Sequence, residues 1–320
     1  MSSVAVIGAG AWGTALAIQA TRAGNRVTLW ARDPLRAGTI AASRENPHLP
    51  GVRLPEAIQV ASVPPDTADV ALLAVPTQHL RGVLGRFAPG LAPLVVCAKG
   101  VEQATLRLPL EIVTELRPGT PAAVLTGPNF AHEIAAGLPA AAVVAAVDAT
   151  LRESVAALLG TPAFRLYGND DPIGAQVGGA AKNVIAIAAG AVIGAGLGEN
   201  ARAALITRGL AELARLAVAL GGHAATVMGL SGLGDLLLTC TGAASRNYSL
   251  GLALGRGERL ADVLAARSSV TEGVATAPAL VARAQGVDMP VCVAVASLLA
   301  GRTTLAEAIA AVLARPRRDE

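Results

Sequence analysis

Near its N-terminus the chain reads Val4-Ala5-Val6-Ile7-Gly8-Ala9-Gly10-Ala11-Trp12-Gly13. The four apolar residues predict a short buried β-strand, and the alanine-rich segment after the glycines predicts a helix. Glycines spaced G-x-G-x-x-G between a strand and a helix are typical of a dinucleotide-binding Rossmann fold. Gly8 permits the tight turn, Gly10 lets a pyrophosphate approach the backbone, and Gly13 lets helix and strand pack closely. The helix N-terminus then presents its N–H groups to the phosphates. The alternative is an ordinary glycine-rich turn.

The first half of the chain alternates short apolar runs with helical stretches. Runs that are apolar on both faces and separated by helices predict a parallel sheet that helices cover on both sides. The turn-rich stretch Ser43–Pro65 is expected to be a long connection. We expect a helix at Ala11–Ala23 and strands at Val4–Ile7, Arg26–Trp30, Val70–Val75, Pro93–Ala98, Ala122–Thr126 and Ala140–Val147.

The texture of the sequence changes at the polar, turn-forming cluster Gly168–Pro172. Beyond it lie long Ala- and Leu-rich segments with helical spacing, and no convincing strand pattern follows. A length of 320 residues is also typical of two domains. We therefore predict an α/β Rossmann domain with a parallel-rich sheet over residues 1–170, and an all-α domain over residues 171–320.

The composition excludes several classes of protein. Hydrophobic residues make up 53% and charged residues 15%, so intrinsic disorder is excluded. A net charge of +3, scattered along the chain, does not favour nucleic-acid binding. The cysteines Cys97, Cys240 and Cys292 have neither metal-ligand spacing nor a disulfide framework, so no metal site is expected and a reducing cytoplasm fits.

Two apolar runs raise the possibility of a membrane-spanning helix. Val184–Gly198 is short, and the run between Arg215 and Asp235 contains turn-forming glycines. Since a spanning helix needs about 20 consecutive apolar residues, we interpret both runs as buried core. The N-terminus lacks the basic region of a secretory signal, so we predict a cytoplasmic protein.

The end of the second predicted strand bears on cofactor choice, and it reads Trp30-Ala31-Arg32-Asp33. An acidic residue there would bind the ribose 2′-hydroxyl and favour NAD, whereas an arginine can accommodate the 2′-phosphate of NADP. Arg32 therefore predicts that NADP is accepted and preferred, while Asp33 keeps NAD possible. The alternative is a surface arginine followed by a helix-capping aspartate.

Motifs along nearly the whole chain resemble the bacterial-type NAD(P)-dependent glycerol-3-phosphate dehydrogenase family. The resemblance implies reversible reduction of dihydroxyacetone phosphate to sn-glycerol 3-phosphate, a precursor in phospholipid synthesis. The motifs occur in the family's order and are Gly8–Ala17, Ala98–Gly100, Leu125–Ala131, Gly178–Ala186, Leu230–Leu236, Ser245–Asn247 and Thr271–Gly273.

The same resemblance assigns roles to individual residues. Lys182 corresponds to the proton donor and acceptor. Two positions depart from the family pattern: Ala11 stands where serine is common, and Asn129 where serine or threonine is common. The implied substrate contacts are Lys99, Gly127, Asn129, Lys182, Asp235, Ser245, Arg246 and Asn247. The implied cofactor contacts are Gly8, Gly10, Ala11, Trp12, Gly13, Arg32, Lys99, Ala131, Arg246, Val270 and Glu272.

The surroundings of Lys182 in the sequence suit proton transfer. It lies in the apolar stretch Gly178–Ala191, where its one polar neighbour is Asn183. Apolar surroundings disfavour an ammonium and lower its pKa from ~10.4 towards ~7–8, where a lysine serves as general acid and base. While charged, the amine also stabilises an oxyanion. The alternative is a lysine that reaches solvent from an otherwise buried helix.

The other candidates also have two interpretations each. Ser245-Arg246-Asn247 offers a hydroxyl, a guanidinium and an amide for a phosphate, or else a helix cap with a solvent-facing arginine. Asp235 either caps a helix or orients Lys182 or a substrate hydroxyl. Lys99 follows a strand, where ligands bind in open α/β sheets, or is a surface lysine. Glu272 contacts the nicotinamide ribose or caps a helix.

Two rival functions remain at this point. The β-hydroxyacid dehydrogenases share the layout and also use a lysine, but Ser245-Arg246-Asn247 favours a phosphorylated three-carbon substrate. A non-catalytic NAD(P)-binding sensor would keep the three glycines without needing Lys182 or the phosphate residues. The many apolar helices also lead us to expect a homodimer.

Overall fold

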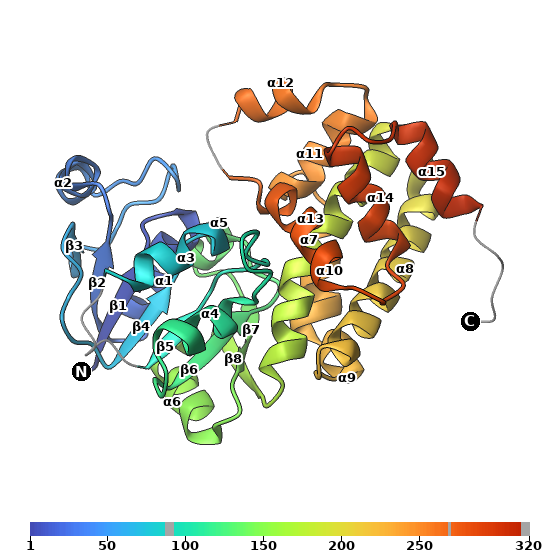
Figure 1. Cartoon of the computed structure of the whole chain (residues 1–320). Coiled ribbons are helices and arrows are strands. Elements are labelled where there is room, and N and C mark those ends of the chain that lie inside the picture. Colours follow the sequence, from blue (N-terminus) through green and yellow to red (C-terminus); the bar gives the residue numbers. More distant parts are fainter. Residues whose placement is uncertain (87–92, 268–269, 315–320) are drawn as a thin grey trace. The chain divides into compact units, whose positions relative to one another are not determined.

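The computed structural model describes residues 1–86, 93–267 and 270–314 (Figure 1). Its chain forms two compact units. The first comprises Met1–Lys99 and Arg107–Gln176, and the second comprises Gly100–Leu106 and Val177–Glu320.

The first unit contains an eight-stranded sheet in the order β3-β2-β1-β4-β5-β6-β7-β8. Neighbouring strands are parallel, except that β6 and β7 are antiparallel. A parallel-rich Rossmann sheet was predicted, and it is confirmed. The strands are β1 (Ser3–Ile7), β2 (Arg26–Trp30), β3 (Ile58–Ala61), β4 (Val70–Leu73), β5 (Leu94–Val96), β6 (Ala122–Thr126), β7 (Ala140–Ala145) and β8 (Phe164–Asn169).

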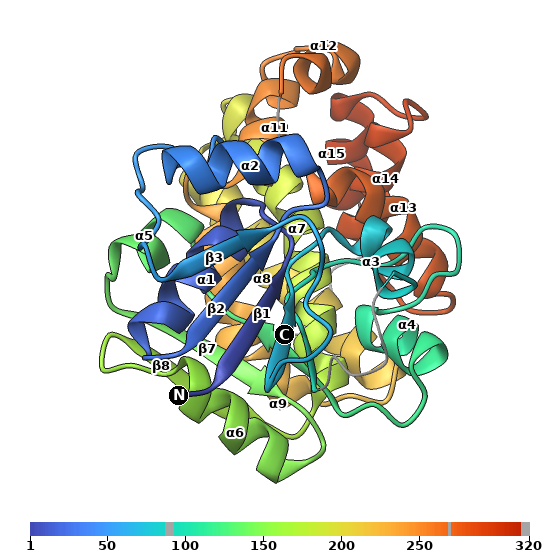
Figure 2. The same ribbon diagram turned by 90° about the vertical axis from the view of Figure 1, so that its left-hand side faces the viewer.

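Helices cover both faces of this sheet. Successive residues of a strand point to opposite faces, and in the central strands the residues on both faces are apolar, so each face needs a covering layer. Val4 and Val6 belong to one buried cluster, and Ala5 and Ile7 to the other. Figure 2 shows α1 and α5 on the left of the sheet and α3 and α4 on its right. The helices of this unit are α1 (Ala11–Arg22), α2 (Pro34–Ser43), α3 (Thr77–Leu84), α4 (Pro109–Leu116), α5 (Ala131–Ala136) and α6 (Ala149–Leu159).

Two strands were missed by the sequence interpretation. β3 lies inside Ser43–Pro65, which was wrongly expected to be a connection, and β8 includes the first residues of the cluster Gly168–Pro172. Both strands lie at edges of the sheet. Edge strands bury few side chains, so their sequences lack a continuous apolar run; in β8 only Phe164 is fully buried. The one antiparallel pair, between β6 and β7, is compatible with the parallel-rich sheet that was predicted.

The described part of the second unit is helical, with no strand between residues 177 and 314, as predicted. Its elements are α7 (Pro172–Gly194), whose first five residues belong to the first unit, α8 (Gly198–Ala219), α9 (Ala224–Val227), the π-helical turn η1 (Leu230–Gly234), α10 (Asp235–Cys240), α11 (Arg246–Gly255), α12 (Leu260–Ala265), α13 (Glu272–Arg283), α14 (Pro290–Leu299) and α15 (Leu305–Leu313).

By length and composition α7 could cross a membrane, but 89% of its most apolar window is buried inside the protein. It therefore has the burial of a core helix, as interpreted for Val184–Gly198. The run between Arg215 and Asp235 is core only in part: Leu216 and Val227 are fully buried. Val218 and Met228 of the same run are 57% and 48% exposed, because it forms the end of α8, the short α9 and a turn.

The backbones of α7 and α11 touch through glycines. A Cβ atom on Gly251 would lie 1.9 Å from the carbonyl oxygen of Ile187, and one on Gly190 would lie 2.0 Å from that of Tyr248. No side chain fits at these distances, so glycine is what allows the helices to approach. The contact fixes the start of α11, and with it Ser245–Asn247, against the helix that carries Lys182.

Candidate functional site

The glycine-rich turn of the first unit has the shape of a phosphate cradle. Gly8 has a φ of +117°, and its N–H donates to the carbonyl of Trp30 at 3.1 Å. A Cβ on Gly13 would lie 1.8 Å from the carbonyl oxygen of Gly8, so the turn packs directly on α1. A Cβ on Gly10, by contrast, would meet nothing within 4 Å. The turn is thus packed on its inner side and open at Gly10, which fits a dinucleotide pyrophosphate.

Most of the other predicted cofactor residues of the first unit lie at or just before the start of a helix. Ala11 and Trp12 begin α1 and are partly buried against the core, and Ala131 begins α5 in the same way. Arg32 is exposed. Asp33 is the N-cap of α2, since its carboxylate accepts the N–H of Leu35 at 3.0 Å, which is the capping alternative stated for it.

Two residues around the turn were missed by sequence reasoning. Arg36 donates to the carbonyl of Ala9 at 2.5 Å, and the side-chain amide of Asn46 donates to the same oxygen at 3.1 Å. Arg36 lies in α2, four residues after Arg32, and this second nearby arginine is the only hint in the sequence. Asn46 lies in the turn-rich stretch, where nothing local distinguishes it.

The structure brings together three predicted substrate residues at the carboxyl ends of β5 and β6. The ammonium of Lys99 donates to the carbonyl of Gly127 at 3.2 Å. Gly127 has a φ of +134°, and the amide of Asn129 donates to the carbonyl of Ala141 at 3.1 Å. The Asn129 side-chain oxygen is buried and has no hydrogen-bond partner in the part of the chain that is described. It therefore offers an acceptor to a ligand hydroxyl.

Lys182 lies in a buried polar cluster within the second unit. Its Nζ is 2.5 Å from Oδ1 of Asp235 and donates to Oγ1 of Thr239 at 3.0 Å. Thr239 in turn donates to the backbone carbonyl of Asp235 at 2.6 Å. The Lys182 side chain is 10% exposed and that of Asp235 is 0% exposed. Lys182 was expected in largely apolar surroundings, with Asp235 as one candidate to orient it; in the fold the Asp235 carboxylate contacts the ammonium and compensates its charge.

Small residues allow Asp235 to reach Lys182. A Cβ on Gly178, one turn before Lys182 on α7, would lie 2.4 Å from the carbonyl oxygen of Ser231 in η1. This contact places α10, which starts at Asp235, beside α7. The N-cap of α10 is Gly234 without a side-chain cap, so the interpretation of Asp235 as a capping residue is wrong. Thr239, on the same face of α10, was missed because only the packing of two helices reveals it.

The segment Ser245–Asn247 has a largely structural arrangement. The Ser245 hydroxyl caps α11 by accepting the N–H of Tyr248 at 3.2 Å. The Asn247 amide donates to Asn183 at 2.9 Å and accepts the N–H of Gly273 at 3.0 Å. Arg246 is exposed at the start of the helix. Of the expected three-residue anion cradle, the guanidinium is thus the side chain that faces solvent.

The remaining candidates adjoin this segment. Val270 is 52% exposed. Glu272 is the first residue of α13, where the positive end of the helix dipole stabilises a carboxylate. Thr271, not Glu272, occupies the N-cap position, so the interpretation of Glu272 as a cap is wrong. The bond from Gly273 to Asn247 ties the start of α13 to α11.

Two of the buried cysteines have thiols with raised pKa values. Burial raises the pKa of Cys240, next to Thr239, to about 12, and that of Cys97 to about 12 as well. Their thiols are therefore protonated near neutral pH. Over the described residues, no group of three or more His, Cys, Asp or Glu side chains could hold a metal ion.

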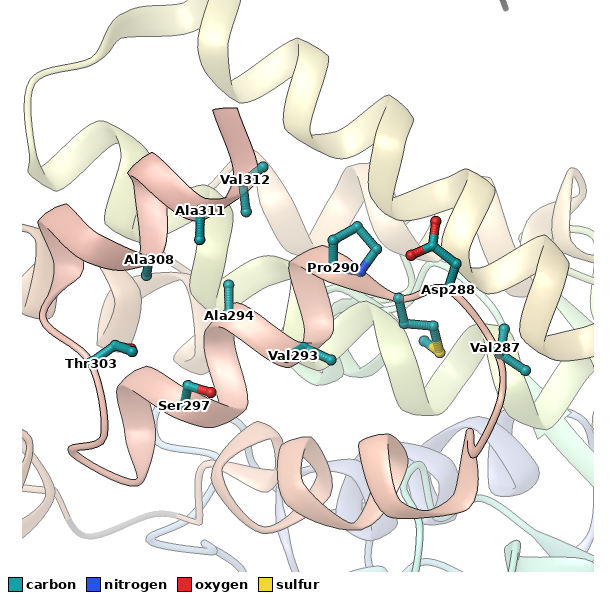
Figure 3. A pocket seen from close by; sticks show the side chains of 11 residues that line it. Val287, Asp288, Pro290, Val293, Ala294, Ser297, Thr303, Ala308, Ala311 and Val312 are labelled. Carbon is teal, nitrogen blue, oxygen red and sulfur yellow. The ribbon is translucent and has the colours of Figure 1, made fainter. Parts of the chain in front are cut away.

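A cavity of about 370 Å³ lies elsewhere in the second unit (Figure 3). Side chains of α14 and α15, among them Val293, Ala294 and Ala308, line it together with the segment Val287–Pro290. None of the residues predicted to bind substrate or cofactor lines this cavity.

Comparison with known proteins gives consistent results. A family model described as the NAD-dependent glycerol-3-phosphate dehydrogenase N-terminus matches residues 3–152, and the C-terminus model matches residues 171–310. The chain is 60% identical to a glycerol-3-phosphate dehydrogenase [NAD(P)+] of Acidiphilium cryptum over 318 residues, covering 99% of this chain and 98% of that one. For the enzyme of the same name in Gluconobacter oxydans, identity is 54% over 322 residues, with 99% and 98% covered. The crystal structure of glycerol-3-phosphate dehydrogenase from Coxiella burnetii superposes with a TM-score of 0.93 at 35% identity, covering 98% and 99% of the two chains.

Proposed function

This chain belongs to the NAD-dependent glycerol-3-phosphate dehydrogenase family, and we propose that Lys182 is the proton donor and acceptor of its reaction. The enzyme interconverts dihydroxyacetone phosphate and sn-glycerol 3-phosphate with NAD or NADP. The predictions of family, fold, enzyme class and cofactor type are thereby confirmed. The observation that supports the role of Lys182 is its buried cluster with Asp235 and Thr239.

In this mechanism the bound nicotinamide supplies the hydride. Lys182 holds a proton on Nζ, gives it to the alkoxide that forms during ketone reduction, and takes it back in alcohol oxidation. Its charge stabilises the developing oxyanion before the proton moves. Asp235 compensates the ammonium, and Thr239 fixes the direction of Nζ through a second hydrogen bond.

Arg246 is our candidate for binding the substrate phosphate. Its guanidinium matches the geometry of a phosphate, and the N-terminus of α11 favours an anion beside it. Ser245 and Asn247 hold the turn that presents Arg246. We propose Lys99 and Asn129 as further contacts, because one offers an ammonium and the other a buried acceptor without a partner among the described residues.

The glycine turn binds the dinucleotide in this proposal, with Arg32 favouring NADPH through its exposed guanidinium beyond β2. The family pattern adds Ala11, Trp12, Ala131, Val270 and Glu272 as cofactor contacts. We assign most of the cofactor binding to residues 1–170, and catalysis and the substrate phosphate site to residues 171–320; Lys99 and Asn129 of the first part also contact substrate in this proposal, and Val270 and Glu272 of the second contact cofactor.

The cellular setting is also proposed. A cytoplasmic enzyme that supplies glycerol 3-phosphate for phospholipid synthesis fits the three free, buried cysteines, since thiols persist in a reducing compartment. A homodimer is supported by large apolar side chains exposed on the second unit, such as Val293 and Leu313 at 45% and 77%. Light scattering of the purified protein tests the dimer.

The decisive experiment compares the wild-type protein with Lys182→Met in NADPH and NADH oxidation with dihydroxyacetone phosphate. We expect turnover to fall by about 10²–10⁴-fold, the usual contribution of a general acid. Binding of NADPH, measured separately by fluorescence, should persist. Near-normal turnover of the variant would exclude the proton role of Lys182. Failure of the wild-type protein to reduce this ketone, with activity on a 3-hydroxyacid instead, would favour the β-hydroxyacid class.

A further inference from the structure

The glycine turn is anchored by side chains that come from beyond β2. Arg36 on α2 donates from Nη2 to the carbonyl of Ala9, which lies between the first two glycines, at 2.5 Å. The same nitrogen donates to the side-chain oxygen of Asn46 at 3.2 Å. Arg36 is partly buried, whereas Arg32, four residues earlier and ahead of the helix, is exposed.

Asn46 extends this anchor to the first turn of α1. It is 1% exposed, and its amide donates both to the carbonyl of Ala9 at 3.1 Å and to the hydroxyl of Thr14 at 2.6 Å. Thr14 in turn donates to the carbonyl of Gly10 at 2.9 Å. The carbonyls of two consecutive turn residues are therefore held on the protein side, which leaves the N–H groups that follow them directed to the open side at Gly10.

We propose that Arg36 is a positioning residue of the dinucleotide turn that strengthens the binding of NADH and NADPH to the same extent. It acts in two ways, by holding the Ala9 carbonyl and by placing a positive charge beside the turn that receives the pyrophosphate. Both cofactors share the pyrophosphate, so the effect does not depend on the 2′-phosphate. Discrimination between the cofactors is left to Arg32. This inference rests on the proposed function, which assigns a nicotinamide dinucleotide to this turn.

The guanidinium is well suited to this role. Because two of its acceptors are fixed backbone and amide oxygens, it cannot swing towards an adenosine ribose without breaking both bonds. Burial lowers the pKa of Arg36, but an arginine stays charged at neutral pH. A partly buried charge is also screened less by salt and water than an exposed one.

The test measures dissociation constants of NADH and NADPH by fluorescence for the wild-type protein, Arg36→Gln, Arg36→Lys and Arg32→Gln. We expect Arg36→Gln to raise both constants by about the same factor, about tenfold or more, since a charge-assisted hydrogen bond is lost. Arg36→Lys, which keeps the charge and a donor, should restore part of the affinity for both. Arg32→Gln should weaken NADPH far more than NADH.

Salt separates a charge effect from mere loss of structure. The difference between the wild-type protein and Arg36→Gln should shrink in part as KCl rises, because salt screens the charge but not the hydrogen bond to Ala9; a difference that does not change with KCl would exclude the charge effect. The melting temperature of each cofactor-free variant shows whether it is folded. Selective weakening of NADPH by Arg36→Gln, no change for either cofactor, or no rescue by lysine would overturn the inference. If the wild-type protein binds neither dinucleotide, the proposed function itself fails.

Discussion

The buried ion pair between Lys182 and Asp235 makes Asp235→Asn the most informative single substitution. The variant keeps the shape of the side chain but removes its charge. The Lys182 side chain, only 10% exposed, is then left as a buried ammonium without a carboxylate. Breaking one side of a buried pair costs about 3–5 kcal/mol. The loss has an upper limit of similar size, because Lys182 can instead fold in its neutral form. Removing the proton from a lysine of ordinary pKa ~10.4 costs about 5 kcal/mol at pH 7.

The stability of Asp235→Asn should depend on pH, because the cost of a neutral Lys182 falls as pH rises. If the variant folds with a neutral Lys182, its unfolded state binds one proton more, so its stability rises with pH up to about 10. The deficit against the wild-type protein should therefore shrink by about 1.4 kcal/mol per pH unit above neutrality. Urea unfolding at pH 7 and pH 9 measures it. Far-UV circular dichroism is the suitable probe, since both tryptophans, Trp12 and Trp30, lie in the first unit.

The matched control is the double variant Lys182→Met with Asp235→Asn. Removing both charges leaves no uncompensated ion, so the double variant should lose less stability than Asp235→Asn alone. Equal losses in the single and double variants would refute the reasoning. So would an Asp235→Asn protein as stable as the wild type at pH 7.

Three further predictions concern packing, capping and thiols. Gly251→Ala should destabilise the protein by about 3 kcal/mol or more, because the new Cβ would lie 1.9 Å from a backbone oxygen. Gly38→Ala is the control: its Cβ would meet no atom within 4 Å on α2, so it should stabilise the protein by about 0.5–1 kcal/mol. Thermal unfolding of the two variants measures the difference. Glu212 accepts the N–H of Val291 near the start of α14, and burial raises the pKa of its carboxyl group. The folded state therefore binds a proton more tightly than the unfolded state, so the contribution of Glu212 to the free energy of unfolding should fall as pH rises from 4.5 through the raised pKa. In urea unfolding at pH 4 to 8, Glu212→Gln should lack this decrease of the free energy of unfolding with pH. The same pH dependence in the variant and the wild-type protein would contradict a raised pKa at Glu212. Cys97, with a pKa raised to about 12, should resist thiol reagents at pH 8 until urea unfolds the chain, as mass spectrometry can show.

Part of this molecule could be predicted from neighbouring residues along the chain. The strand–turn–helix at Val4–Gly13 combines an apolar run with spaced glycines, and the central strands carry apolar residues on both faces. The edge strands β3 and β8 could not be predicted in this way, because an edge strand buries few side chains. Cofactor and substrate roles came from motifs in the family's order, and most of these roles remain proposals.

The tertiary structure alone decided which polar groups meet. Lys182 and Asp235 are 53 positions apart, and they touch because glycine contacts let η1 and α10 approach α7. Arg36 and Asn46 reach the glycine turn by the same kind of long-range packing. The spacing of apolar residues along a strand or helix, and the residues that a turn requires, follow from local steric rules. Strands, helices and turns can therefore be inferred from adjacent residues. The partner of a buried charge depends on how helices far apart in the sequence pack, which no local pattern specifies.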